Sequence, residues 1–355
     1  MSVTNPDSAR PARQSEPEIL PAEYAGPVVW HGCIQTGTQS VEAYRVAATQ
    51  GQALVQLLVL PGNPGSAAFY VPFLRGLHAA WQGRAEVTAI SHLGHGALGP
   101  HSTQLYTLLQ QISHQLYTLR QQISHQVAFI RQHLLLPGRP PLAIMGHSIG
   151  AYMALHAAHR VEEADSNGQH NDSCTRPRIC KIVGVFPFLT VDPGSLKQKF
   201  LRCCTRIPGV MGGAAALLGM LPPWLLKLIV QLGTKGGMDE HAVAAALDLL
   251  REPAASNAFY LGQTEFTDLA SPADWWLLEQ FGPRAAILCA PQDVWFPHWK
   301  WEEMWLKVPG VEAYMEELQR HDFCVSVELS AQMARRTASI VNRALDNTVR
   351  NTAYG

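Results

Sequence analysis

The pentapeptide GHSIG at residues 146–150 constrains the fold of this chain most, because it joins two segments of different pattern. Residues 141–145 (PLAIM) are short and apolar, as in a buried strand, whereas residues 151–158 (AYMALHAA) have the composition of a helix. Glycines on both sides let the chain turn sharply between the two and lift the serine hydroxyl clear of the sheet. The context therefore predicts a nucleophile elbow with Ser148 as the nucleophile.

Further strand candidates favour a mainly parallel sheet with helices on both faces. An antiparallel hairpin is expected to open the chain, and helical or loop segments separate the later strands. The predicted strands are Val28–Trp30, Val41–Val46, Ala53–Leu60, Ala85–Ile90, Leu142–Met145, Ile182–Phe186, Ala285–Cys289 and Val311–Met315. With 355 residues and 47% hydrophobic residues, the chain is long enough for one large α/β domain with an insertion.

Charge and cysteine usage narrow the function classes. The formal net charge is −1 and there is no basic block, so a nucleic-acid partner is not expected. The seven cysteines have no paired spacing, which favours reduced thiols inside a cell over a disulfide framework. Residues 1–26 are rich in Pro, Ser, Glu and Ala without an apolar core, and they are expected to be a disordered tail rather than a signal peptide.

A tandem duplication follows the fourth predicted strand. Residues 104–114 read QLYTLLQQISH and residues 115–125 read QLYTLRQQISH, so one apolar stripe continues through both copies. Eleven residues make almost three helical turns, and the copying therefore predicts a helix lengthened by about 16 Å without rotation of its face. We interpret it as a neutral lengthening of the helix or as an error in the gene model.

An apolar insertion is expected at residues 191–283, between two core segments at residues 27–190 and 284–355. Within it, Ile207–Leu232 is almost continuously apolar and long enough to cross a bilayer. Pro222 and Pro223 interrupt the stretch and favour two short helices joined by a bend. Two interpretations stay open: the helices contact a lipid droplet or membrane surface, or they pack on the core as a lid.

The remaining members of a catalytic triad are predicted by chain order. A serine nucleophile needs a base and an orienting acid, and after an elbow of this kind they follow in the order acid, then histidine. Asp293 comes just past the strand at Ala285–Cys289, and His321 lies in a loop after the last strand. Asp322 is the competing acid, but its position next to His321 favours a solvent-facing or helix-capping role.

An oxyanion hole is predicted at a second turn. The strand ending at Leu60 runs into PGNPGS, and a turn rich in Gly and Pro exposes backbone N–H groups. In this arrangement one donor comes from such a turn and the other from the residue after the nucleophile. The backbone amides of Asn63 and Ile149 are therefore the expected donors.

Other chemistry-bearing residues are interpreted more simply. His92, His95 and His101 lack an accompanying carboxylate or cysteine at ligand spacing, so neither a metal nor a cofactor is expected. Cys203 and Cys204 fit buried small side chains better than palmitoylation sites. An aromatic-dense region could reach a lipid interface or line an acyl pocket, although packing is the expected role of most of its members. It contains Trp275, Trp276, Trp295, Trp299, Trp301 and Trp305.

Several longer motifs resemble the lipid droplet-associated hydrolase family. The matching segments include LVLPGNPG (58–65), SHLGHG (91–96), GHSIGAYMAL (146–155), AFYLGQTEF (258–266) and QDVWFP (292–297). The resemblance covers roughly residues 28–338 and implies an α/β-hydrolase fold with an apolar helical lid. It also implies a Ser148, Asp293 and His321 triad, and a location on lipid droplets and the cytosolic face of the endoplasmic reticulum.

The sequence thus leads to a concrete functional expectation with two alternatives. A serine hydrolase acting on lipid esters, such as sterol esters or acylglycerols, would work through an acyl-enzyme at lipid droplets. One alternative is a soluble carboxylesterase or thioesterase for smaller substrates, with Ile207–Leu232 a packed lid. The other is a non-catalytic protein that keeps the fold and organises droplets.

Overall fold

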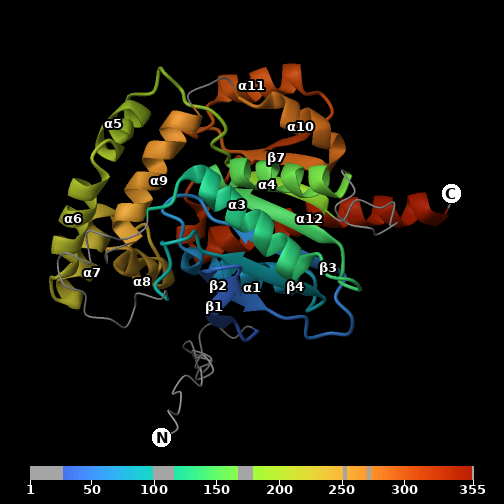
Figure 1. The fold of residues 1–355 in the computed structure, drawn as a ribbon, viewed down its shortest axis with the longest axis horizontal. Helices are drawn as coiled ribbons and strands as arrows, with labels where there is room; N and C mark the ends of the chain where they lie inside the picture. Colours follow the sequence, from blue (N-terminus) through green and yellow to red (C-terminus); the bar gives the residue numbers. More distant parts are fainter. Residues whose placement is uncertain (1–26, 99–115, 167–178, 251–253, 270–272, 354–355) are drawn as a thin grey trace, which may run out of the picture.

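The computed structural model describes residues 27–98, 116–166, 179–250, 254–269 and 273–353. In this part of the chain one eight-stranded sheet runs through the molecule in the order β1-β2-β4-β3-β5-β6-β7-β8 (Figure 1). Its first two pairings, β1 with β2 and β2 with β4, are antiparallel, and all others are parallel. The strands are β1 Trp30–Thr36, β2 Gln39–Val46, β3 Val55–Leu60, β4 Ala85–Ile90, β5 Leu142–His147, β6 Ile179–Val185, β7 Ala285–Cys289 and β8 Glu312–Met315.

The predicted mainly parallel sheet is confirmed, and most strand positions agree to within a few residues. The clearest difference is β1, which begins at Trp30, where the predicted strand ended. Every residue of β3, β5, β6 and β7 is buried. These strands lie between two helical layers, which explains why they read as continuous apolar runs rather than alternating ones.

Two helical layers enclose the sheet. One face packs against α1 (Val71–Ala80) and α12 (Val327–Ala353), and the other packs against α3 (Leu119–Phe129) and α4 (Ile149–Ser166). Helix α11 (His298–Lys307) follows β7. Helix α4 continues to Ser166, through the first seven residues of the polar segment at 160–178.

The helix expected to run through the duplicated segment is not continuous, which corrects that prediction. Residues 116–118, in the second copy, are not helical, and α3 begins only at Leu119. Thr118 is extended, and its hydroxyl and backbone pair with Gln121 in a capping box, which fixes the start of α3 at Leu119. The first copy lies outside the described residues, as do the tail at 1–26 and His101.

Six helices of the described chain form the insertion between β6 and β7. They are α5 Leu196–Thr205, α6 Pro208–Gly219, α7 Pro223–Gly233, α8 Glu240–Leu249, α9 Ala254–Asp268 and α10 Trp275–Phe281. Helices α5 to α9 gather at one end of the molecule (Figure 1). The predicted pair of short apolar helices is present, because α6 ends at Gly219 and Pro223 starts α7. Among the described residues, none of the helices has the length and apolar character needed to span a membrane.

Candidate active site

Ser148 occupies a sharp turn between β5 and α4. Its backbone is in the left-handed region, with φ at +54°, a conformation that costs about 1–3 kcal/mol for a residue with a side chain. Both flanking glycines are required sterically. A Cβ at Gly146 would overlap the Gly150 carbonyl, and one at Gly150 would overlap the carbonyl oxygens of Leu60 and Pro61. The turn thus packs against the end of β3.

The three predicted triad side chains meet at one edge of the sheet. His321 Nε2 lies 3.1 Å from Ser148 Oγ, and His321 Nδ1 lies 2.9 Å from Asp293 Oδ2. Both distances are within the reach expected of a nucleophile, base and orienting acid. The Asp293 side chain is fully buried, whereas 23% of the His321 side chain is exposed. The imidazole therefore hydrogen-bonds the acid through Nδ1 and the serine through Nε2.

The loop after β7 holds the Asp293 carboxylate in place. Its Oδ1 accepts a hydrogen bond from the Trp295 backbone N–H at 2.8 Å. The competing acid, Asp322, faces solvent and pairs with Arg320 at 2.9 Å instead. Of the two candidate acids, Asp293 is therefore the one that hydrogen-bonds the His321 ring in the described structure.

The turn at Pro61–Gly65 lies against the serine. A Cβ at Gly62 would come within 2.9 Å of Ser148 Cβ, so only glycine allows this approach. Within the described residues no acceptor is found for the backbone N–H of Asn63 or of Ile149. The two amides proposed as oxyanion donors are thus both next to the serine and without a competing partner.

A buried pair that the sequence did not predict connects this turn to the histidine loop. The Tyr70 hydroxyl accepts from the Gly62 N–H at 3.0 Å and donates to His147 Nδ1 at 2.6 Å. His147 Nε2 then donates to the His321 carbonyl at 2.8 Å. Burial, and next the neighbouring His321, hold the pKa of His147 well below its ordinary value, and burial raises the pKa of Tyr70. Both side chains therefore stay neutral, which matches these donor and acceptor roles.

A second unpredicted contact joins the same turn to the insertion. The Asn63 amide donates to the Ala258 carbonyl at 2.9 Å and to Glu265 Oε1 at 3.1 Å, both on α9. Burial raises the pKa of Glu265 to about 8, although the hydrogen bond from Asn63 opposes the shift. The carboxyl is therefore mainly protonated at neutral pH. Asn63 was expected to act through its backbone, and its side chain turns out to be an anchor for α9.

His92 and His95 lie against the turn, next to Gly65. Both are almost fully buried, and His95 Nδ1 donates to the Pro64 carbonyl at 2.6 Å. Burial lowers the pKa of His95 to about 4. No group of three or more potential ligands among the described residues is arranged to hold a metal ion. These histidines support the backbone of the turn as neutral rings.

A cluster of aromatic rings lies beside His321. Trp295 lies 4.8 Å from Phe188 and 6.0 Å from His321, measured between ring centroids. Phe188 also contacts Phe266 of α9, so core and insertion share this cluster. Trp276, Trp299 and Trp305 are exposed instead. Of the tryptophans singled out from the sequence, Trp295 is thus the one close to the triad.

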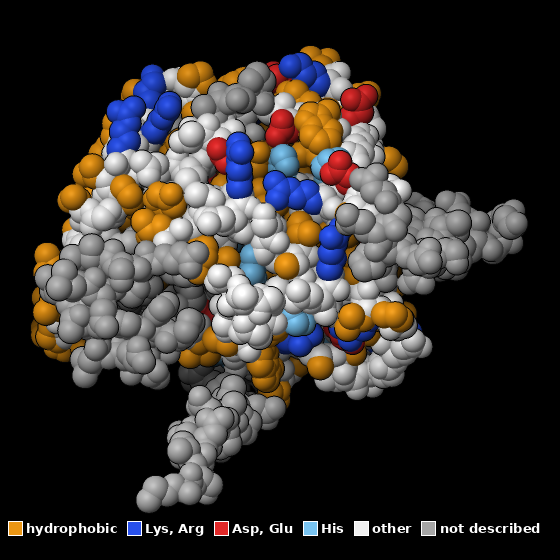
Figure 2. Space-filling view, in the orientation of Figure 1, with side chains coloured by type: hydrophobic (Ala, Val, Ile, Leu, Met, Phe, Trp, Pro, Cys, Tyr) orange, Lys and Arg blue, Asp and Glu red, His pale blue; other side chains and the backbone are white. Residues whose placement is uncertain are grey.

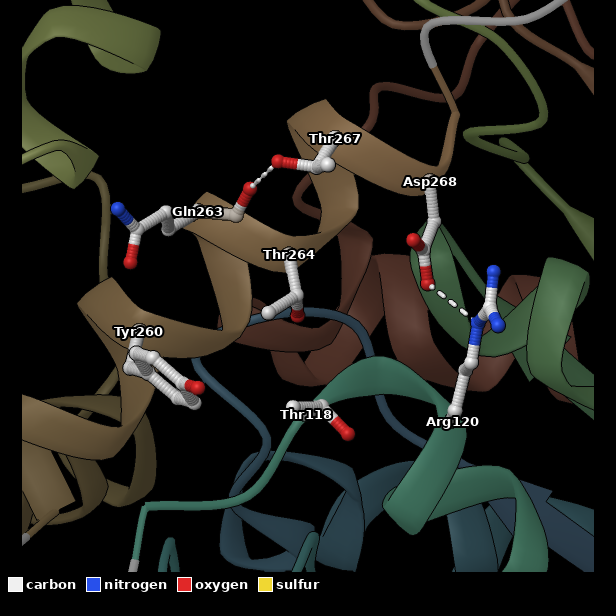
Figure 3. A pocket seen from close by; sticks show the side chains of 7 residues that line it. All are labelled: Thr118, Arg120, Tyr260, Gln263, Thr264, Thr267 and Asp268. Atoms are coloured by element: carbon white, nitrogen blue, oxygen red, sulfur yellow. Dashed lines mark hydrogen bonds and ion pairs between the residues drawn. The ribbon is translucent and has the colours of Figure 1, made fainter.

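A polar pocket lies between α3 and α9, separate from the triad (Figure 3). Its lining includes Arg120, whose Nε lies 3.5 Å from Asp268 Oδ2, and Thr267, whose hydroxyl donates to the Gln263 carbonyl. The full lining is Thr118, Arg120, Tyr260, Gln263, Thr264, Thr267 and Asp268. None of these is a predicted site residue. Helix α9 thus contacts Asn63 through Ala258 and Glu265, and it lines this pocket with other residues.

Comparison with known sequences finds one family across most of the chain. A family model described as lipid-droplet associated hydrolase matches residues 54–324. The mouse (Mus musculus) protein named lipid droplet-associated hydrolase is 28% identical over 293 residues, which are 81% of this chain and 84% of the relative. The Dictyostelium discoideum protein of the same name is 20% identical over 237 residues, 66% of this chain and 69% of the relative.

Solved structures show the same fold at low identity. The enol-lactonase from Burkholderia xenovorans LB400 has a TM-score of 0.55 and 12% identity, with 88% of this chain and all of that chain covered. A soluble variant of monoglyceride lipase from Saccharomyces cerevisiae, solved with a substrate analogue, has a TM-score of 0.54 and 13% identity, covering 91% of this chain and all of that one. These similarities confirm the α/β-hydrolase fold.

Proposed function

Because the chain belongs to the lipid droplet-associated hydrolase family, we propose that it is a serine hydrolase that cleaves lipid esters at the droplet surface. The observation that carries the proposal is the hydrogen-bonded line of Ser148, His321 and Asp293, with 3.1 Å and 2.9 Å between successive side chains. Sterol esters and acylglycerols are the substrate classes proposed.

The first half of the reaction transfers the acyl group to the enzyme. His321 Nε2 takes the proton of Ser148 as its oxygen attacks the ester carbonyl, and Asp293 holds the imidazole in the tautomer that can accept it. The carbonyl oxygen becomes an oxyanion that accepts from the N–H groups of Asn63 and Ile149. His321 then gives its proton to the departing alcohol, and the acyl-enzyme remains.

The second half releases the acid. His321 takes a proton from water, which attacks the acyl carbon, and the same amides stabilise the second oxyanion. His321 returns the proton to Ser148 as the fatty acid leaves. No step needs a metal or an organic cofactor.

The exposed apolar side chains of α6 and α7 support a lipid surface as the place of reaction. These helices bury only Gly212 and Leu226, respectively. What we call the apolar face comprises Ile207, Val210, Leu217, Leu218, Met220, Trp224, Leu228, Ile229 and Leu232, all exposed. Large exposed apolar areas mark interaction sites, and these side chains would be buried if both helices packed on the core with their apolar residues inward.

Labelling with a fluorophosphonate probe tests the nucleophile. The variant Ser148→Ala is expected to lose all labelling, because its Oγ is the atom that the probe modifies. Ser124→Ala, an exposed serine on α3, serves as the control and should label like the wild type. Labelling retained in Ser148→Ala would assign the reactive group to another residue.

A tagged protein in cells with oil-loaded droplets tests the lipid surface. The triple variant Leu217→Gln, Trp224→Gln, Leu232→Gln is expected to reduce the ring-like signal around droplets, because it removes much of the apolar area that would leave water. The control changes three exposed leucines elsewhere, Leu54→Gln, Leu306→Gln and Leu318→Gln. A diffuse wild-type signal would favour a soluble esterase, and signal on the endoplasmic reticulum can be scored in the same images.

Restoration of droplet size separates an enzyme from an organising protein. Ser148→Ala should fail to restore normal droplets in cells that lack the protein, because turnover is required. Full restoration by this variant would support the non-catalytic role.

A further inference from the structure

The first part of the insertion differs in charge from the rest of the chain. Residues 193–238 contain six Lys and Arg residues and no Asp or Glu, although the whole chain has a net charge of −1. Four of the six lie on α5 or directly after it. We call Lys197, Lys199, Arg202 and Arg206 the basic face.

The four cations of the basic face point into solvent. All are exposed, and within the described part of the chain no ion pair joins any of them to a carboxylate. Lys227 of α7 differs, because it pairs with Glu240 at 3.3 Å. Among the residues that the structure describes, the positive charge of α5 therefore has no carboxylate partner.

The basic face is continuous with the apolar face. On α5 the side chains of Leu196 and Phe200 are 80% and 68% exposed, so apolar groups alternate with the cations. Helix α5 packs against α6 and α9, which places it beside the apolar face. Figure 2 shows Lys and Arg side chains gathered over α5, with hydrophobic side chains next to them toward α6.

We propose that the basic face binds the headgroups of anionic phospholipids when the apolar face enters a lipid layer. This inference rests on the lipid-surface docking proposed above and adds a requirement for charge. A helix that combines cations with exposed Leu and Phe fits the boundary between headgroups and acyl chains, whereas an acidic protein partner offers no layer for the apolar groups. Each cation near an anionic surface strengthens binding about fivefold.

The inference is tested by sedimentation of the full-length protein with vesicles of two compositions. One is phosphatidylcholine alone, and the other is an equimolar mixture of phosphatidylcholine and phosphatidylserine. The wild type is expected to bind the mixed vesicles at least about tenfold more tightly, and less so at high salt, where the Debye length falls to about 3 Å at 1 M.

The test variant is Lys197→Gln, Lys199→Gln, Arg202→Gln, Arg206→Gln, which should lose the preference while still binding both vesicles weakly. The control removes four exposed cations elsewhere, Arg84→Gln, Lys307→Gln, Arg335→Gln and Arg343→Gln, so the change in net charge is the same. Circular dichroism checks the fold, and the double variant Lys197→Gln, Lys199→Gln replaces the quadruple one if that melts early.

Four outcomes would overturn the inference. If the wild type binds both vesicles equally, docking stands but the basic face has no role in it. If the quadruple variant keeps the preference, or the control loses it equally, the charge acts from elsewhere. If the wild type binds neither vesicle, the lipid-surface proposal itself fails and this inference with it.

Discussion

At the scale of single residues, Tyr70 and His147 hold the backbone on both sides of the serine. Tyr70 fixes the Gly62 N–H, and His147 fixes the carbonyl of His321, the residue proposed as the base. In this buried network, each donor of Tyr70 and His147 meets an acceptor. A network that is fully satisfied in this way makes a site rigid. A shift of either end would move the turn at Pro61–Gly65 relative to the imidazole.

We expect Tyr70→Phe to lower kcat about tenfold with little change in KM, because a mispositioned base raises the barrier by roughly 1.4 kcal/mol. The unpaired Gly62 N–H should also lower the free energy of unfolding by about 1–3 kcal/mol. Steady-state kinetics on a soluble ester and urea denaturation measure the two effects. Tyr260→Phe, on the pocket side of α9, is the control. A normal kcat in Tyr70→Phe would show that Tyr70 and His147 only fill space in the core and do not position the base.

At the scale of elements, the joint of β5 and α4 depends on close backbone contact. Gly150 lies in the first turn of α4, directly against the carbonyl oxygens of Leu60 and Pro61 at the end of β3. In contrast, Gly213 on α6 has open space around it. Glycine is therefore sterically required at position 150, whereas position 213 has room for a side chain.

Gly150→Ala is therefore expected to destabilise the fold by several kcal/mol or prevent expression, because its methyl group would overlap two carbonyl oxygens that cannot move independently. Gly213→Ala should instead stabilise the protein by about 0.5–1 kcal/mol through its better helix propensity. Thermal denaturation of both variants provides the comparison. Equal melting temperatures would show that the turn relaxes more easily than its geometry suggests.

At the scale of the whole molecule, the Asn63 and Glu265 contact ties the insertion to the catalytic core. Glu265 of α9 is 202 residues from Asn63 in sequence, and it is almost fully buried where α9 meets the turn at Pro61–Gly65. With its pKa raised to about 8, the folded chain retains a proton there that the unfolded chain loses near pH 4.5. Stability from this group is thus complete below about pH 4.5 and lost as pH rises toward about 8.

Replacing Glu265 with Gln removes this pH dependence. The free energy of unfolding of Glu265→Gln, relative to that of the wild type, should increase by a few kcal/mol as pH rises from about 5 to about 8. The reason is that the amide cannot ionise. Urea denaturation at the two pH values measures the change, with the exposed Glu317→Gln as control. A difference between variant and wild type that is independent of pH would contradict the assignment.

Local pattern was enough for the order of elements and for the candidate triad. Apolar runs marked the buried strands, and the positions of Asp293 and His321 after the last two strands singled them out. Residues at the carboxyl ends of parallel strands lie at one edge of the sheet, so their convergence follows from strand direction alone. The structure brings their atoms to hydrogen-bonding distance, while their catalytic roles are proposals.

The supporting contacts were decided only by tertiary structure. Nothing in the neighbourhood of Tyr70 or Glu265 marks them as partners of His147 and Asn63, which lie 77 and 202 residues away, respectively. Such pairs depend on which strands are neighbours and on how closely α9 approaches the sheet. The helix expected through the duplication fails for a related reason: periodicity predicts which face is apolar, whereas the capping box at Thr118 and packing decide where the helix begins.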